Sequence, residues 1–215
     1  MKKKWFYLSF LVFCLLLTSC TIVSIEEVEQ RQKSETFDPV SYVDSVWESR
    51  IVPTITEKAV DLPKVLEAVQ EDLAKAGEQY AKISVSGAYN FMVKGSGVVE
   101  SVDTSSSNGI AVIKLDSYQG PIVVKLQIGP RISGDSVRDS VGFIEFGMFK
   151  EQTEYGKVSR EINKRIADTV VKDLNVKQLP SKSVTFYGAF TIRTTNQTDL
   201  KIKEVVIVPV KIEVK

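Results

Sequence analysis

The sequence predicts a mixed α+β protein, and two observations lead to this prediction. Apolar residues recur at helical steps of three and four before Ser84, and they alternate with polar residues after it. The segments after Ser84 follow the order three strands, one helix, two strands. A five-stranded, partly open barrel with a helix between strands three and four has this order. We therefore expect a small N-terminal helical subdomain packed on an OB-like five-stranded β-barrel.

Two helices are expected before the strands. Asp38-Pro39 is a typical helix start, because the carboxylate can accept from free backbone N–H groups and proline fits the first helical position. This helix should end at Pro53. A second helix should be capped by Asp61, and Gly77 should stop or bend it. Because neither helix can hide its apolar stripe alone, both should pack on the strands.

The strand region begins with a long alternating segment from Tyr89 to Val102, in which Gly95 and Gly97 indicate a bend or a bulge. Asn108-Gly109 predicts a hairpin turn. The other expected elements are strands over 110–115, 122–128, 184–192 and 206–214, a polar loop over 131–140 and a helix over 154–174. The last strand should present one apolar face from Val206 to Val214 and should lie partly at a sheet edge because of Pro209. A half-open sandwich, or a twisted sheet carrying one helix, would give the same order.

The N-terminal segment predicts the location of the protein. Lys2, Lys3 and Lys4 precede an apolar run over 5–17 that is too short to span a bilayer comfortably. This pattern is typical of a secretory signal peptide, here over residues 1–19. Leu17-Thr18-Ser19-Cys20 resembles the lipobox of bacterial lipoprotein signals, in which the cysteine sulfur is lipidated and the chain is cut just before it. The alternative is an uncleaved anchor that ends in a cysteine.

The predicted organisation is therefore a signal peptide (1–19), a lipidated tether (20–36), a helical subdomain (37–83) and an OB-like α/β barrel domain (84–215). The lipid on Cys20 should hold the protein at the extracytoplasmic side of a bacterial membrane, because two acyl chains give stable anchoring. Cys14 would leave with the signal peptide and Cys20 would carry lipid, so that no thiol would remain.

The composition excludes several classes of function. The 215 residues include no His, which rules out a Ser-His-Asp centre and an imidazole metal ligand. The formal net charge of +1 argues against nucleic-acid binding by a broad positive field. We accordingly expect no enzyme activity, no catalytic residues, no metal and no cofactor.

The most polar candidate site lies around a glycine-containing loop. Its members are Arg131, Gly134, Arg138, Asp139, Glu154 and Tyr155. Adjacent Arg138 and Asp139 could bind a carboxylate, a phosphate or sugar hydroxyls. In a second interpretation they satisfy the backbone groups of the loop itself. A glycosidase-like pair such as Glu145 and Glu154 is a third hypothesis, which nothing in the spacing requires.

A set of residues within 90–155 forms a recognisable pattern. Its members are Asn90-Phe91, Val93, Gly95, Gly97, Gln127-Ile128-Gly129-Pro130, Gly134, Arg138-Asp139, Phe143-Ile144, Phe146 and Glu154-Tyr155. In this pattern the chain resembles a family of predicted bacterial periplasmic lipoproteins of unknown function. The resemblance implies a helical subdomain joined to an OB-like part, and an association with transport systems for simple sugars of the ribose type. The family pattern has Thr near Asp135 and Asn near Glu151, where this chain departs from it.

Together these observations predict a non-enzymatic, lipid-anchored envelope lipoprotein that assists a simple-sugar uptake transporter. It would bind the transporter, its solute-binding protein or a saccharide. The alternative is a structural or assembly factor of the cell envelope.

Overall fold

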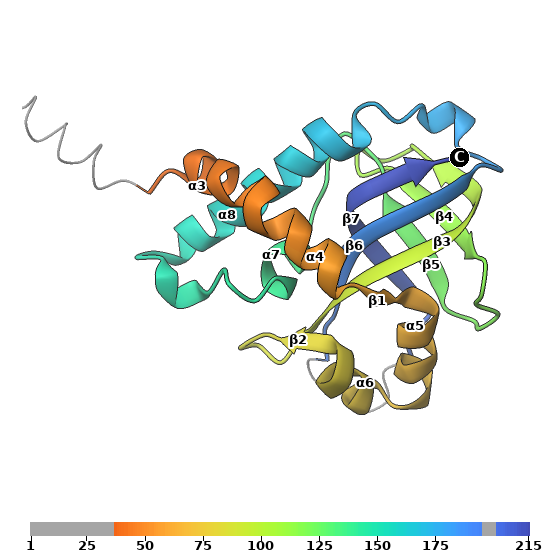
Figure 1. Cartoon of the computed structure of the whole chain (residues 1–215), viewed down its shortest axis with the longest axis horizontal. Helices are drawn as coiled ribbons and strands as arrows, with labels where there is room; N and C mark the ends of the chain where they lie inside the picture. Colours follow the sequence, from red (N-terminus) through yellow and green to blue (C-terminus); the bar gives the residue numbers. More distant parts are fainter. Residues whose placement is uncertain (1–36, 195–200) are drawn as a thin grey trace, which may run out of the picture. The chain divides into compact units, whose positions relative to one another are not determined.

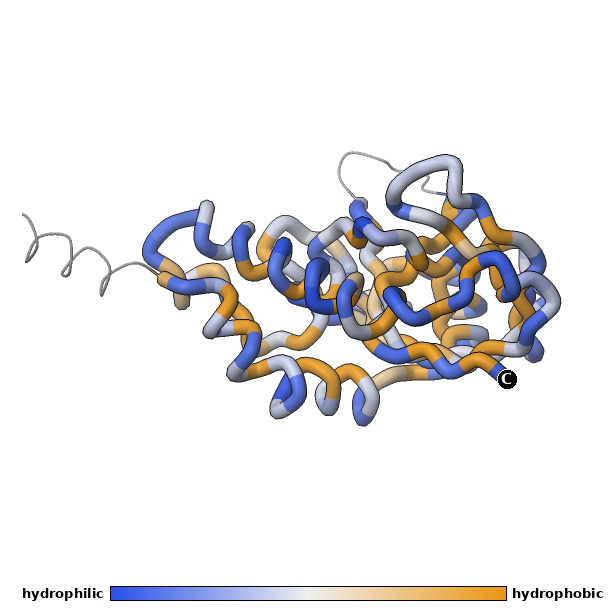
Figure 2. The backbone as a smooth tube through the Cα atoms, turned by 90° about the horizontal axis from the view of Figure 1, so that it is seen from above, coloured by the Kyte–Doolittle hydropathy of each residue, from blue (hydrophilic) through white to orange (hydrophobic). Residues whose placement is uncertain are grey.

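The computed structural model describes residues 37–194 and 201–215, so the predicted signal peptide, Cys20 and the tether lie outside the described residues. Residues Asp38–Lys215 group into one unit, in which helices pack on one mixed sheet (Figure 1). The predicted α+β class and the N-terminal helical part are both present. Figure 2 shows hydrophobic and hydrophilic residues alternating along much of the chain, as expected for elements with one buried face.

The N-terminal helical segment consists of α3 (Pro39–Val46), the π-helical turn η1 (Trp47–Ile51) and α4 (Val52–Lys58). The Asp38 carboxylate accepts hydrogen bonds from the backbone N–H groups of Val40 and Ser41, which confirms the predicted cap. The predicted end at Pro53 is wrong, since the helix continues to Lys58. Proline cannot donate to the carbonyl one turn earlier, and the π turn η1, which ends at Ile51, changes the hydrogen-bond pattern just before Pro53.

The predicted second helix is two helices, α5 (Leu62–Glu71) and α6 (Leu73–Tyr80), which follow the short strand β1 (Val60–Asp61). The chain is extended at Asp72, whose carboxylate caps α6 by accepting from the N–H of Lys75 at 3.1 Å. Asp61 does not cap α5 with its side chain and instead pairs with Lys94 at 3.5 Å. The predicted stop at Gly77 is wrong, since α6 continues past it to Tyr80. A glycine is needed there because the ring of Tyr89 occupies the space of a Cβ atom.

Within residues 37–194 and 201–215, the sheet has seven strands. Besides β1 they are β2 (Ala81–Ile83), β3 (Tyr89–Asp103), β4 (Ile110–Leu115), β5 (Val123–Gln127), β6 (Ser183–Ile192) and β7 (Glu204–Val214). The order is β1-β3-β4-β5-β7-β6, and β3 also pairs with β2 and β6. All neighbours are antiparallel except the β1–β3 and β5–β7 pairs.

The expected five-stranded barrel needs correction, because the sheet is not a true barrel. Strand β3 pairs with β6 over Tyr89–Val98 but with β4 only from Gly97 to Asp103. The pairings of β3 with β6 and with β4 overlap only at Gly97 and Val98. On the side where β4 would continue, the first half of β3 pairs with the short strands β1 and β2. The ring of strands is therefore partly open along β3.

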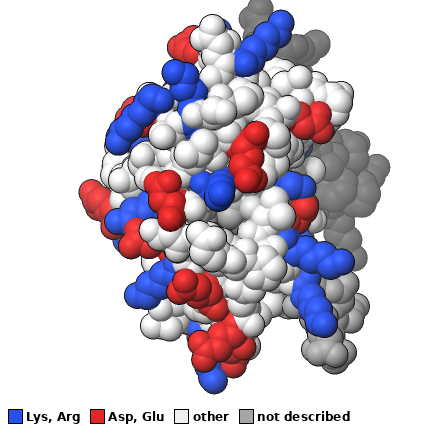
Figure 3. All heavy atoms as spheres, turned by 90° about the vertical axis from the view of Figure 1, so that its right-hand side faces the viewer, with Lys and Arg blue, Asp and Glu red and all other residues white. Residues whose placement is uncertain are grey.

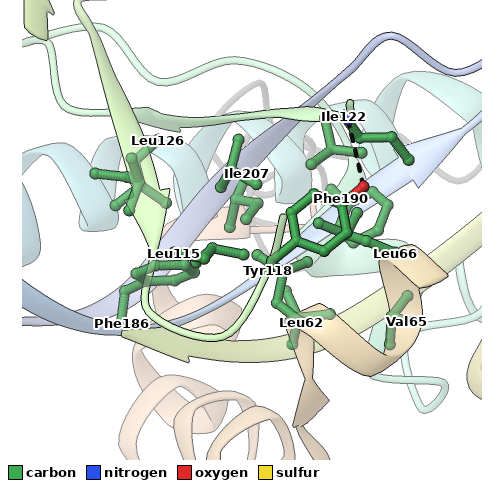
Figure 4. Packing of buried hydrophobic residues seen from close by; sticks show 14 of the residues in the cluster. Leu62, Val65, Leu66, Leu115, Tyr118, Ile122, Leu126, Phe186, Phe190 and Ile207 are labelled. Carbon is green, nitrogen blue, oxygen red and sulfur yellow. Dashed lines mark hydrogen bonds between the residues drawn. The ribbon is translucent and has the colours of Figure 1, made fainter. Parts of the chain in front are cut away.

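A hydrophobic core fills the space between α5 and the inner faces of β3 to β7 (Figure 4). The rings of Phe91 and Phe190, on neighbouring strands, stack with centroids 4.9 Å apart. The Tyr118 hydroxyl accepts from the N–H of Ile122 at 3.3 Å and donates to the side chain of Gln70 at 3.1 Å. These contacts close the core between the β4–β5 connection and α5.

The connection between β5 and β6 contains α7 (Ser136–Ser140), η2 (Phe146–Met148), α8 (Gln152–Ile166), η3 (Ala167–Val171) and η4 (Val176–Gln178). The helix predicted between strands three and four is therefore present as α8 with the π turn η3. The loop predicted over 131–140 is wrong in its second half, where α7 packs on β6 through the hydroxyl of Ser136 and the carbonyl of Ala189. Helix α8 packs on α3, and Arg165 pairs with Asp44 there.

Strand β7 differs from the prediction in its buried face. Val208 and Val210 of the predicted face are buried, but Val205 and Ile207 of the opposite face are buried as well and Val214 is exposed, so the prediction of a single apolar face from Val206 to Val214 is correct only in part. An irregularity in the β6–β7 ladder, where Gly188 faces Pro209, changes the alternation. Among the described strands, β5 pairs with β7 only at Glu204–Ile207, so Pro209 lies on an edge segment as predicted.

We predict that Gly188→Ala destabilises the fold by about 2 kcal/mol, because the new Cβ would overlap the carbonyl oxygen of Val208 and press on Pro209. Gly156→Ala is the matched control. It lies in α8 with open space around it, and alanine is the better helix former by about 0.5–1 kcal/mol. Urea unfolding should therefore give changes of opposite sign. Equal effects of the two substitutions would contradict this account of Gly188.

Candidate functional site

A groove of about 990 Å³ lies between the β2–β3 hairpin and the segment from α7 to α8. Ile83 and Val85 form its hairpin wall, and Phe146 stands on the opposite side. Arg138 and Tyr155 contribute to its lining between these walls, which we call the floor. Of the predicted loop residues, the structure brings Arg138, Asp139 and Tyr155 together here.

The floor of the groove contains a buried ionic cluster. Arg138 is only 6% exposed, and its Nε donates to Oδ1 of Asp139 at 2.7 Å. Its Nη1 donates to the backbone carbonyl of Tyr155 at 3.1 Å. The Tyr155 hydroxyl donates to the same Asp139 oxygen at 2.8 Å, and the guanidinium carbon of Arg138 lies 3.6 Å from the centre of the Tyr155 ring. The three side chains therefore hold one another in place.

These contacts shift two pKa values. Burial, followed by the hydrogen bond and negative charge of Asp139, raises the pKa of Tyr155 to about 12. Burial alone would lower the pKa of Arg138, but the hydrogen bond and charge of Asp139, together with the charge of Asp135, raise it instead. Asp135 lies 3.5 Å from Nη1 of Arg138. The phenol thus stays protonated and the guanidinium stays charged at neutral pH.

The arrangement directs the polar groups of Arg138 toward the protein itself. Its Nε and Nη1 are bonded to Asp139 and to a backbone carbonyl, and its flat face covers the Tyr155 ring. A ligand carboxylate or phosphate would compete with these contacts. This geometry agrees with the second interpretation only in that both side chains bond within the protein, because the carbonyl that Arg138 reaches belongs to Tyr155 in α8 and not to the loop.

The other three predicted residues do not join this cluster. Glu154 caps the start of α8, because its carboxylate accepts from the N–H groups of Lys150 and Glu151 at 3.0 and 3.4 Å. Gly134 has a positive φ of 105°, and its carbonyl accepts from the Asn163 side chain at 2.8 Å. Arg131 is exposed, and with Gly134 it lines a smaller groove on another side of α8.

The hairpin wall was not predicted as part of a site. It is fixed by Asn90, which is completely buried. Its Nδ2 donates to the carbonyl of Lys82 at 3.1 Å, and its Oδ1 accepts from the Thr191 hydroxyl at 2.7 Å. The sequence carried one signal for this wall, the apolar Val85 between Ser84 and Ser86 in a turn.

The model of a family described as predicted periplasmic lipoprotein (DUF2291) matches residues 10–213. The chain belongs to this family. The lipoprotein is accordingly extracytoplasmic and lipid-anchored. No helix among residues 37–194 and 201–215 is long and apolar enough to cross a membrane.

The lipoprotein is also similar to the crystal structure of an OB-fold protein from Thermotoga maritima, with a TM-score of 0.65 and 19% identity. The similarity covers 84% of the lipoprotein and 100% of that chain. At this identity it shows the fold alone. None of the curated proteins compared with the lipoprotein matches it.

We predict that Asp139→Ala destabilises the lipoprotein by about 2 kcal/mol, because it leaves the buried Arg138 without its closest carboxylate. Asp135→Ala is the control on the same guanidinium. Its carboxylate is more exposed and lies farther away, so the loss should stay below about 1 kcal/mol. Urea unfolding measures both, and equal losses would contradict the assigned role of Asp139.

The raised pKa of Tyr155 predicts a dependence of stability on alkaline pH. An unfolded tyrosine ionises near pH 10, whereas Tyr155 in the folded state holds its proton to about pH 12. The stabilisation is therefore complete below pH 10 and is lost as the pH rises toward 12. Between pH 10 and pH 12, the free energy of unfolding should fall less for Tyr155→Phe than for the wild-type protein. Urea unfolding at several pH values measures this difference. An unchanged pH profile would show that Tyr155 titrates normally.

Proposed function

We propose that the lipoprotein is a non-enzymatic accessory of a simple-sugar uptake transporter and acts by binding a protein component of that system in the groove. The observation that carries the proposal is the apolar hairpin wall. Val85 is fully exposed and Ile83 is 46% exposed, and both line the groove. Exposed apolar side chains grouped at a concave surface are typical of protein-binding sites.

The floor of the groove supports a protein partner over a saccharide. A sugar site needs polar groups that are free to bond hydroxyls and an aromatic face for the ring. Arg138 covers one face of Tyr155, and Phe146 and Phe149 each pack on the Tyr155 ring with centroids 5.6 Å away. Asp139 already accepts two hydrogen bonds. A protein segment can instead bury the side chains of Ile83 and Val85 without breaking these bonds.

The non-enzymatic part of the proposal is supported by the acids of the candidate segment. Glu154 is engaged as a helix cap, and Asp139 is engaged with Arg138 and Tyr155. Within the described ranges 37–194 and 201–215, no group of three or more Asp, Glu, Cys or His residues is placed to hold a metal ion. The link to sugar uptake comes from the family resemblance and from the lipid anchor, which keeps the protein beside membrane transporters.

We predict that a photo-crosslinking residue at position 85 in intact cells captures a component of a simple-sugar transporter. The control is the same residue at position 123, because Val123 is also exposed and apolar but lies outside the groove on β5. Val85→Asp should lower capture from position 83 about tenfold, since it places a charge in an apolar contact.

Mass spectrometry of the captured proteins decides between the functions. Cell-wall or assembly proteins at position 85, with no transporter component, would favour the structural or assembly alternative. Uptake of ribose-type sugars that changes neither on deletion nor on overexpression of the lipoprotein would contradict the transport role.

A further inference from the structure

A second apolar surface lies at the end of the molecule where the anchored chain enters it. Its members, which we call the anchor-side patch, are Val40 on the first turn of α3 and Phe146 and Met148 in η2. Phe146 is 51% exposed and Met148 is 56% exposed. Exposed large apolar side chains grouped on one short turn are typical of surfaces that contact a protein or a membrane.

The contacts of α3 place this patch close to the point of entry. Asp38 begins the described unit, and α3 packs along α8 from there. The ring of Tyr42 meets the ring of Phe149 edge to face, with centroids 5.9 Å apart. Phe149 directly follows Met148, so η2 lies beside the first turns of α3. Figure 1 shows the starts of α3 and α8 at the same end of the molecule.

We propose that the anchor-side patch rests in the lipid surface of the membrane that holds the acyl chains of Cys20. Residues 21–37 join the lipidated cysteine to Asp38 and can extend to at most about 60 Å. Every conformation of this segment keeps Asp38 within that distance of the bilayer, so the part of the molecule near Asp38 is the part that reaches the lipid most easily. The effective concentration of lipid at Phe146 and Met148 is accordingly high.

The surrounding charges favour contact by apolar burial over attraction to anionic lipid. Glu145 precedes η2, Lys150 and Glu151 follow it, and all three side chains are exposed. This balance gives no positive surface of the kind that binds anionic headgroups. The opposite end of the molecule carries Lys, Arg, Asp and Glu side chains scattered in both signs, as Figure 3 shows. Such a surface has no preference for a bilayer.

The proposal has a consequence for the groove, because Phe146 belongs to both surfaces. With Phe146 at the lipid surface, the groove opens beside the bilayer. A partner seated against Ile83 and Val85 would then be part of a membrane protein or be held against one. The lipid contact itself does not depend on the proposed transport function.

The test places a fluorescent label on the full lipidated protein in phosphatidylcholine vesicles that contain a lipid-bound quencher. Met148→Cys supplies the only free thiol, because the mature chain has lipid on Cys20 and no other cysteine. Val123→Cys is the control, with an exposed apolar side chain on β5. We expect lipid-bound quencher to reduce the signal at position 148 roughly twofold or more and to leave position 123 unchanged.

Two further experiments test whether the patch itself contacts lipid. One tests whether the label inserts into the bilayer by itself, and the other tests whether a protein covers the patch. Phe146→Ser, combined with the label at position 148, should restore most of the signal, whereas unchanged quenching would show that the label inserts by itself and would overturn the proposal. Equal signals at positions 148 and 123 would also overturn it. Protection of position 148 in native membranes, without quenching in protein-free vesicles, would show that a protein covers the patch and would overturn the lipid contact. An unchanged melting temperature of each variant confirms that the fold is intact.

Discussion

The long strand β3 carries hydrogen bonds to β1, β2, β4 and β6, and the positions of the other parts depend on these pairings. Its inward residues Phe91, Val93 and Val99 are almost completely buried, so the strand has one fixed register in the core. The same register sets where β2 leaves the sheet and therefore where the hairpin wall of the groove stands. Asn90 ties that wall to β6 from within the strand, and α7 is fastened to β6 through Ser136. Core and groove are thus two consequences of one set of strand pairings.

The buried ionic cluster explains how a charged residue can lie under a surface that we assign to apolar contacts. Removing Arg138 from water is costly, and Asp139, the Tyr155 carbonyl and the Tyr155 ring together offset that cost. Because these partners come from both α7 and α8, the cluster also fixes the relative position of the two helices. The cluster therefore positions the two helices that line the groove. The exposed apolar residues of the hairpin wall, Ile83 and Val85, remain available to bind a partner.

Much of the fold could be predicted because its signals are local. Strand β4 has the predicted bounds, β3 and β6 follow from period-two alternation, and Asn108-Gly109 forms the expected turn before β4. The errors have specific physical causes. A π turn lets the first helix pass Pro53, and α7 forms where a polar sequence suggested a loop. The short strands β1 and β2 exist only because β3 extends past β4 and offers them an edge.

Neighbouring residues and short periods were enough to predict the export signal, the α+β class and the order of the five long strands with α8 between the third and the fourth. The family match agrees with that interpretation. Which candidate residues meet became visible only in the folded molecule. There Arg138 and Asp139 join Tyr155, Glu154 serves as a helix cap, and Ile83 and Val85 lie opposite Phe146. These contacts join segments far apart in the chain through strand pairing and helix packing, and no local pattern specifies such long-range geometry.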